Sequence, residues 1–343
     1  MSLARAIETG DLAELPSRRD EDWRWTDLRG LIRALPAASA VVEGDVGAGP
    51  FDGLAASVVR VLNGRAEPAA PALSGVVALR WISRGDGAHA GCKAIEVAAG
   101  RTLVLLESYE GQGDHLAEFD LALDVAEGAT VERIVLVDEP AAAVLVSRAE
   151  VTLAPGARFA QTVLTSGARR QRIETRLAHP GGGASARLDG VYLLDDQRHS
   201  DITTVVTHAG AGGNTDQLTK GVVGGQGRGV FQGRIVVEPG ADQTDARMGH
   251  HALLLSDRAE VDAKPELEIF ADDVACAHGN TVGALDEEAL FYAEQRGIPE
   301  AVARAMLTEA FVAEVVDRIE HDGARDVARA WVAERLSGSE DGV

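Results

Sequence analysis

The chain has 343 residues, 54 acidic and 33 basic side chains, a formal net charge of -21 and two cysteines. This length suits two or three compact units, and two cysteines cannot build a disulfide framework, so we expect a reducing, cytoplasmic setting. The excess of acid is unlike the basic footprint of a nucleic-acid-binding protein, and no apolar run reaches the roughly eighteen residues that span a membrane.

The first 75 residues are expected to form a helical region followed by a linker. Apolar residues recur at helical spacing, at Leu28, Leu31, Ile32 and Leu35. Trp23 and Trp25 lie in a charged cluster, and we interpret them as anchors of this small unit, with a docking surface as the alternative. The segments 36–50 and 63–75 are rich in Ala, Gly and Pro, as linkers are. The first residues lack the apolar core of a signal peptide, so none is expected.

Residues 76–284 are predicted to form a β-domain. From about residue 76 to residue 274, short β-branched runs alternate with glycine-containing turns, and almost no helical pattern occurs. A glycine recurs at a spacing of 28 residues or a multiple of it, at Gly100, Gly128, Gly156, Gly212 and Gly240. Ala184 takes the remaining position, directly after three glycines.

A constant spacing of this kind is typical of stacked units, each of which buries its apolar face against the next. Strands and glycine turns that repeat without helices therefore favour a β-solenoid or parallel β-helix. A β-sandwich is the alternative, but it does not require a constant period.

Residues 285–336 are predicted to form a C-terminal helical domain, and residues 337–343 a flexible tail. Asp286 is a good N-cap for the first helix, and Gly297 suits its end. Pro299 suits the first position of the next helix. The pattern therefore indicates that the chain becomes helical again directly after the β-domain.

The second of these helices carries a wide apolar arc. Leu307, Phe311 and Val315 form one stripe. A second stripe lies about one residue step away, at Val312, Val316 and Ile319. This arc is wider than one packing partner needs, so one part could face the protein body and the other a second protein. A helix buried within its own bundle fits the pattern equally well.

Sequence signatures of several enzymes are missing. There is no Gly-x-x-x-x-Gly-Lys-Ser/Thr loop, so we expect no ATP site in this chain, and there is no Gly-x-Ser-x-Gly motif. Polysaccharide lyases and hydrolases can also be β-helices, but they need clustered carboxylates or calcium sites. The pairs Asp195–Asp196 and Asp272–Asp273 would point to opposite faces of a strand, so we interpret them as acids in turns.

Two other pairs carry possible metal ligands. His250 and His251 are neighbours, which cannot both face one metal from a regular strand, and we interpret them as turn residues. Cys276 and His278 end a strand-like run two residues apart, so an extended chain presents them on one face, where they suit iron or zinc. The alternatives are a small buried cysteine and a histidine that shapes a turn. An iron–sulfur cluster normally takes about four protein ligands, so any others must come from another chain or from sulfide.

Long motifs in a fixed order surround these two residues. They comprise the segments 229–237, 243–246, 251–256 and 265–298, with a looser match at 22–28. In these motifs the chain resembles the SufB/SufD family of the SUF iron–sulfur cluster assembly machinery. The stretch from Cys276 to Gly283 is similar to the SufD branch, because the SufB branch typically has an acid in place of Gly279.

The resemblance implies a right-handed parallel β-helix between helical regions, in a scaffold protein without catalytic activity of its own. It also implies pairing with a SufB-like paralogue through the β-helices. A SufC-like ABC ATPase would bind the C-terminal helices, which gives Leu307, Phe311 and Val315 a candidate docking role.

The resemblance also implies a site. His278 matches a family histidine at the shared interface, where iron or a nascent iron–sulfur cluster would be held jointly with the partner, and Cys276 is the weaker candidate. Some family members are associated with a reduced flavin, although no residue here identifies its site.

Alternatives from other functional classes remain. They are a β-helix polysaccharide lyase or hydrolase, and a structural adaptor without a metal role. Whether the isolated chain forms homodimers stays open. The segment 97–200 matches the family mainly in style, and the N-terminal region is short, so no functional residue is transferred there.

Overall fold

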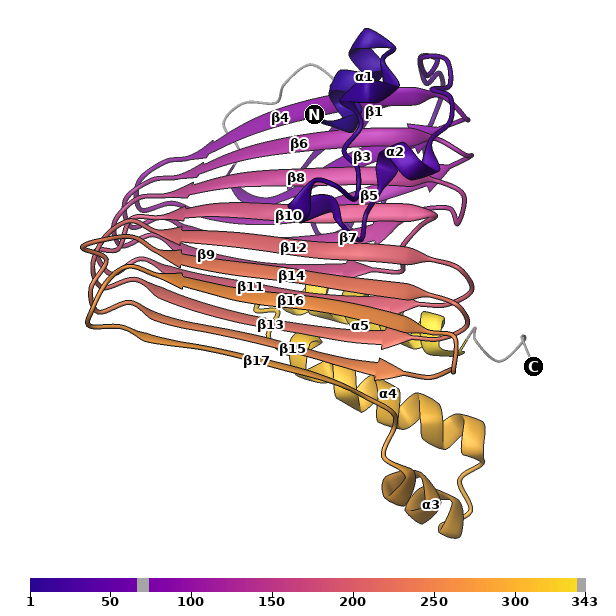
Figure 1. Ribbon diagram of the computed structural model, residues 1–343. Helices are drawn as coiled ribbons and strands as arrows, with labels where there is room; N and C mark the ends of the chain where they lie inside the picture. The colour runs from indigo at the N-terminus through magenta and orange to yellow at the C-terminus, as the bar shows by residue number, and fades with distance from the viewer. Residues whose placement is uncertain (67–73, 338–343) are drawn as a thin grey trace.

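The computed structural model describes residues 1–66 and 74–337, which form a parallel β-helix of about seven turns with helices at both ends (Figure 1). Each full turn contributes one strand to each of two sheets. Neighbouring strands in the described residues are parallel, apart from one short hairpin near the N-terminal end. The predicted β-solenoid is therefore confirmed, and the β-sandwich is excluded.

The odd-numbered strands form one sheet, which we call the odd sheet. They are β1 (Ser57–Leu62), β2 (Arg65–Ala66), β3 (Gly75–Arg84), β5 (Thr102–Gln112), β7 (Thr130–Asp138), β9 (Arg158–Thr165), β11 (Ser185–Leu194), β13 (Asn214–Val223), β15 (Asp245–Leu254) and β17 (Ala275–Gly283). The even sheet contains β4 (Ala88–Val97), β6 (Leu116–Val125), β8 (Val144–Leu153), β10 (Arg170–His179), β12 (His199–His208), β14 (Arg228–Val237) and β16 (Glu260–Ile269). Strand β1 lies upstream of the expected start at residue 76, because its valine-rich run pairs with β3.

The glycine repeat marks one corner of the solenoid. All five glycines have a positive φ, which L-residues with a Cβ rarely adopt: Gly100 (66°), Gly128 (63°), Gly156 (68°), Gly212 (71°) and Gly240 (84°). The corners also bond to each other, since the N–H of Gly100 donates to the carbonyl of Glu127 in the next turn at 3.0 Å. At the position where the repeat has Ala184, the preceding Gly183 takes the positive φ of 75° instead.

Side chains from both sheets fill the interior, mostly with valine, leucine and alanine. A buried polar network crosses this core. Arg133 donates to Glu107 at 2.7 Å and to Gln161 at 2.6 Å, and both partners come from adjacent odd strands. Trp81 and Tyr109 donate to the other oxygen of Glu107. A buried charge without a partner costs several kcal/mol, so this network favours one stacking register of the turns.

The N-terminal elements cover the outer face of the even sheet. They are α1 (Leu3–Thr9), the 3-10 helices η1 (Leu12–Glu14) and η2 (Glu21–Trp23), and α2 (Leu28–Leu31). These helices are shorter than the spacing of the leucines predicts. Helices of one or two turns are not stable alone, and here they depend on packing against the sheet.

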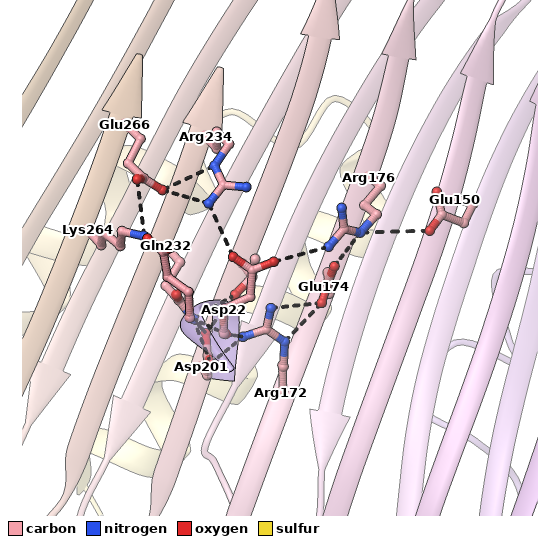
Figure 2. Close-up of polar contacts among 12 residues, drawn as sticks. Asp22, Glu150, Arg172, Glu174, Arg176, Asp201, Gln232, Arg234, Lys264 and Glu266 are labelled. Carbon is pink, nitrogen blue, oxygen red and sulfur yellow. Dashed lines mark hydrogen bonds and ion pairs between the residues drawn. The ribbon is translucent and has the colours of Figure 1, made fainter. Parts of the chain in front are cut away.

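Figure 2 shows how polar contacts fix η2 to the even sheet. The main-chain oxygen of Asp22 accepts hydrogen bonds from Arg172 at 2.7 Å and from Gln232 at 3.1 Å. Arg172 is completely buried and pairs with Asp201 at 2.8 Å. Its guanidinium lies 4.6 Å from the ring centre of Trp23, so Trp23 is an anchor, as predicted.

Three helices follow the solenoid: α3 (Glu287–Gln295), α4 (Glu300–Val316) and α5 (Asp322–Ser337). Asp286 caps α3 as predicted, since its carboxylate accepts the N–H groups of Glu288 and Ala289. Helices α4 and α5 pack on the outer face of the odd sheet and form a second core there. Ser337 ends α5, and the rest of the expected tail, 338–343, lies outside the described residues. None of the described helices is long and apolar enough to cross a membrane.

Candidate functional site

The last turn of the solenoid has no further turn packed against it. Strands β16 and β17 end their sheets, and each pairs with a single neighbouring strand, β14 and β15 respectively. In Figure 1 they lie at the C-terminal end of the stack. Every residue of β17 is exposed except Cys276, which is half-buried. An edge strand of this kind presents unpaired N–H and C=O groups to any further strand.

Both candidate ligands lie on β17. Cys276 pairs in register with Ala246, and His278 pairs with Met248. Side chains in register on parallel strands stack on one face, and Ala246 and Met248 are buried in the interior. Cys276 and His278 therefore share the inward face of the open turn. Their expected place at the end of a strand is corrected, because pairing with β15 continues the strand past Gly279.

The environments of these two side chains differ. Cys276 packs against the apolar cluster of the last turns, and burial raises the pKa of its thiol, with Asp245 acting in the same direction. A backbone hydrogen bond from Ala246 opposes this shift in the pKa. His278 is exposed, and within the described residues its imidazole makes no hydrogen bond or ion pair. Its ring nitrogens are thus free to bind a ligand, whereas the thiol is less readily ionised.

His250, on the preceding strand of the odd sheet, contacts the same turn. It lies on β15 and is completely buried, so its expected place in a turn is corrected. One ring nitrogen is 2.9 Å from the hydroxyl of Tyr192, and the other is 2.6 Å from the side-chain oxygen of Asn280 on β17. Both nitrogens are used, so His250 positions the strand that carries His278. The sequence could not reveal this contact, because it depends on the register of β15 and β17.

The two edge strands differ in protection against pairing. Strand β16 carries charged residues and a proline, which hinder the addition of another strand: Glu260, Asp262, Lys264, Pro265, Glu266 and Glu268. Strand β17 has no proline, acid, lysine or arginine. Large apolar side chains are exposed at the same end, at Ile269 (41%), Phe270 (63%) and Val282 (42%). The β17 edge is therefore less protected against the addition of a strand than the β16 edge.

The described residues of the last turn do not by themselves provide a complete metal site. Among the described residues, no three His, Cys, Asp or Glu side chains are grouped so that they could hold a metal ion. Cys276 and His278 supply two donors at most, and iron–sulfur or zinc centres typically take about four. Donors from another chain would be needed to complete a centre here.

Comparison with known proteins identifies the family. Residues 82–311, more than half of the chain, match the model of the SUF system FeS cluster assembly, SufBD core domain. The chain belongs to the SufB/SufD family. It is 29% identical to the iron–sulfur cluster assembly protein SufD of Escherichia coli, over 98% of this chain and 92% of that protein.

Two further relatives agree with this membership. An iron–sulfur cluster assembly SufBD family protein of Mycobacterium leprae is 27% identical over 96% of this chain and 93% of its own length. SufD of Bacillus subtilis is 32% identical over 42% of this chain and 33% of its own length. SufB/SufD membership gives the chain a role in iron–sulfur cluster assembly, and it leaves the polysaccharide lyase or hydrolase alternative without support.

Two of the three residues in the predicted docking stripe of this SufB/SufD chain pack on the chain's own sheet. Val315 is completely buried in the core between α4 and the odd sheet, so its expected role in binding a partner is corrected. Phe311 is half-buried, and the ammonium of Lys220 on β13 lies 4.4 Å from the centre of its ring. Leu307 is also half-buried. The alternative of a helix packed within its own protein holds for Val315 and Phe311, which belong to the core between α4 and the odd sheet, whereas the docking role of Leu307 stays a prediction.

Other apolar side chains of the same helices face outward. They lie on α3 and on the first half of α4: Phe291 (62%), Tyr292 (61%), Val302 (43%) and Met306 (53%). Helix α3 projects beyond the sheets in Figure 1. Periodicity alone did not identify these residues, because it cannot tell which side of a helix meets the sheet.

Proposed function

We propose that this chain is a non-catalytic scaffold subunit that pairs with a SufB-like paralogue through the last turn of its β-helix. The observation that carries the proposal is the uncharged β17 edge next to exposed Ile269, Phe270 and Val282. Addition of a strand at such an edge gains main-chain hydrogen bonds and buries apolar surface. When the paralogue is absent, the same edge is available to a second copy of this chain.

We further propose that His278 holds iron or a nascent iron–sulfur cluster at this interface. Its exposed imidazole faces the open turn, and the partner chain would supply the missing donors. Cys276 is a second, weaker candidate, because its thiol is half-buried and its pKa is raised. The iron or cluster is a substrate that the scaffold passes on, not a permanent cofactor. A site for which one chain supplies only part of the ligands suits such a transfer. A reduced flavin has support only from the family resemblance.

The ATPase would bind at the exposed apolar residues of α3 and α4. Among the described residues, Phe291, Tyr292, Val302 and Met306 form another group of exposed apolar side chains. Groups of this kind are typical of protein–protein contacts, and aromatic residues often dominate them. We therefore assign the SufC-like ATPase to the helices, which leaves β17 free for the paralogue. ATP hydrolysis is assigned to that partner.

The iron role is tested by His278→Ala, with Thr281→Ala as the matched control on the same strand. Thr281 is exposed and bonds to His251, not to the inward face. The complex with both partners is purified anaerobically, and its iron and sulfide are measured. Loss of groups that only support metal ligands already weakens metal binding by about 10–100-fold, so we expect His278→Ala to lose most of the iron.

Partner binding and the unfolding midpoint should stay unchanged in both variants. Normal iron and sulfide in the His278→Ala complex would refute the ligand role and favour the structural adaptor without a metal role. If the unmodified chain recovers no SufB-like chain even under anaerobic lysis, the pairing proposal is wrong as well.

A further inference from the structure

An arginine-rich hollow lies where the N-terminal segment meets the start of β10. It consists of two adjoining cavities of about 390 and 330 Å³, which share several wall residues. The walls contain five arginines and one carboxylate, namely Arg18, Arg19, Arg29, Arg33, Arg170 and Asp27. Such a concentration of positive charge is unexpected in a chain with a net charge of -21.

Nearby carboxylates leave these arginines uncompensated. Asp27 caps α2 by accepting the N–H of Gly30 at 2.7 Å, and within the described residues it forms no ion pair with an arginine. Asp20 accepts the N–H of Ser17 at 2.8 Å. Glu21 is paired with Lys264 at 2.8 Å. Asp20 and Glu21 are therefore engaged elsewhere, and Asp27 offsets only part of the positive charge of the five arginines.

Arg170 is the most constrained member of the group. Its Nε is buried and has no hydrogen-bond partner among the described residues. Burial lowers the pKa of Arg170, and Arg228 and Arg169 act in the same direction against the influence of Asp27. A buried donor without a partner is costly, so an anion placed beside this guanidinium would be stabilising.

The neighbouring arginines are placed where they can also contact an anion bound beside Arg170. Arg29 is held in place, since its Nε donates to the carbonyl of Leu15 at 3.0 Å. The side chains of Arg18 and Arg33 are exposed, and within the described part of the chain they have no partner. Arg18 and Arg33 thus line both adjoining cavities, Arg170 lines the first with its buried donor, and Arg29 lines the second.

We propose that this hollow binds a phosphate-type oxyanion, either free phosphate or the phosphate group of a small metabolite. Each guanidinium can donate two parallel hydrogen bonds to a phosphate. A tetrahedral dianion accepts bonds from three arginines at once, whereas a carboxylate has only two oxygens, so the excess charge favours phosphate over an acidic peptide. The site does not involve β17, and it stands independently of the scaffold proposal.

Calorimetric titration of the full chain with inorganic phosphate tests the site, with ionic strength held constant because salt screens such contacts. Two variants remove positive charge from the proposed site. One is the double substitution Arg18→Gln with Arg33→Gln, and the other is Arg170→Gln alone. The control pair, Arg101→Gln with Arg258→Gln, removes two exposed arginines that have no side-chain partner among the described residues. We expect saturable binding that weakens about tenfold or more in the site variants and is unchanged in the control.

A titration with AMP distinguishes the two sources. Similar affinities for AMP and phosphate would support free phosphate as the ligand, and tighter binding of AMP would support a phosphorylated metabolite. The proposal is overturned if phosphate gives no saturable binding, or if the control pair weakens it as much as the site variants do. It is also overturned if a glutamate-rich peptide binds with the same arginine dependence while phosphate does not, since the hollow would then receive an acidic protein segment.

Discussion

Five histidines within the described residues are buried in positions that disfavour their charged form. Burial lowers the pKa of each: to about 3 for His89, His199 and His208, to about 4 for His250, and in the same direction for His179. His199 shows the geometry behind this effect. Its Nε2 lies 3.1 Å from the carbonyl of Trp25, and its Nδ1 lies 3.5 Å from the N–H of Gln171. A neutral ring satisfies both partners, because it donates at one nitrogen and accepts at the other.

Acid should therefore destabilise the protein through these residues. The pKa of His199 is about 3 in the folded chain and 6.5 as its ordinary value, so the unfolded chain binds more protons between these limits. The free energy of unfolding then falls as the pH drops below about 6.5, by up to about 1.4 kcal/mol per pH unit for each such histidine. His199→Gln, which can still donate and accept, should reduce this slope in urea unfolding at pH 7.5 and 5. An unchanged slope would contradict the assignment.

Helix α4 has both a buried and an exposed apolar surface. Helix α4 buries Val312, Val315 and Val316 against the odd sheet and α5, while Val302 and Met306 on its first half stay exposed. Lys220 on β13 reinforces the buried side, since it forms an ion pair with Glu314 and lies over the ring of Phe311. Helix α4 thus has two surfaces: its second half packs on the chain itself, and its first half exposes Val302 and Met306.

A single substitution on α3 tests this division. Phe291→Ser should weaken binding of the ATPase by roughly tenfold or more, because a central aromatic contact often contributes about 2 kcal/mol or more. Val41→Ser is the matched control, since the two side chains are 62% and 63% exposed. Affinity is measured by biolayer interferometry with the purified ATPase, and unfolding is measured in parallel. Equal affinity of the two variants for the ATPase would show that the docking site is not on α3.

The two ends of the solenoid differ in how well they are covered by other parts of the chain. At the N-terminal end, α1 covers the even sheet, and the backbone N–H of Ala4 donates to Glu118 at 2.6 Å. At the C-terminal end the last turn is open, and burial declines over β16 and β17. Edge strands with few buried contacts open locally at low cost, so the stack should be least stable where we propose that the paralogue binds.

Amide hydrogen exchange measures this difference in local stability along the solenoid. Amides of β17 should exchange faster than those of β9, which lies between two neighbouring strands in the same sheet. Addition of the SufB-like chain should slow exchange in β17 and leave β4, at the opposite end of the even sheet, unchanged. Protection of β4 without protection of β17 would place the interface at the other end of the solenoid.

The sequence by itself determined the solenoid, the helices that follow it and the family. Glycine spacing, strand periodicity and the Asp286 cap are local features, which can be recognised without knowing what packs on them. The same holds for Cys276 and His278, because alternation along an extended chain puts residues two apart on one face.

Only the tertiary structure decided which faces are buried and which residues meet across the chain. It placed Val315 in the core, paired His250 with Asn280, and brought Arg170 to the arginines of the N-terminal segment. These results depend on strand register and on the side of each helix that meets a sheet. Both arise from contacts between segments far apart in the sequence, so no local pattern encodes them.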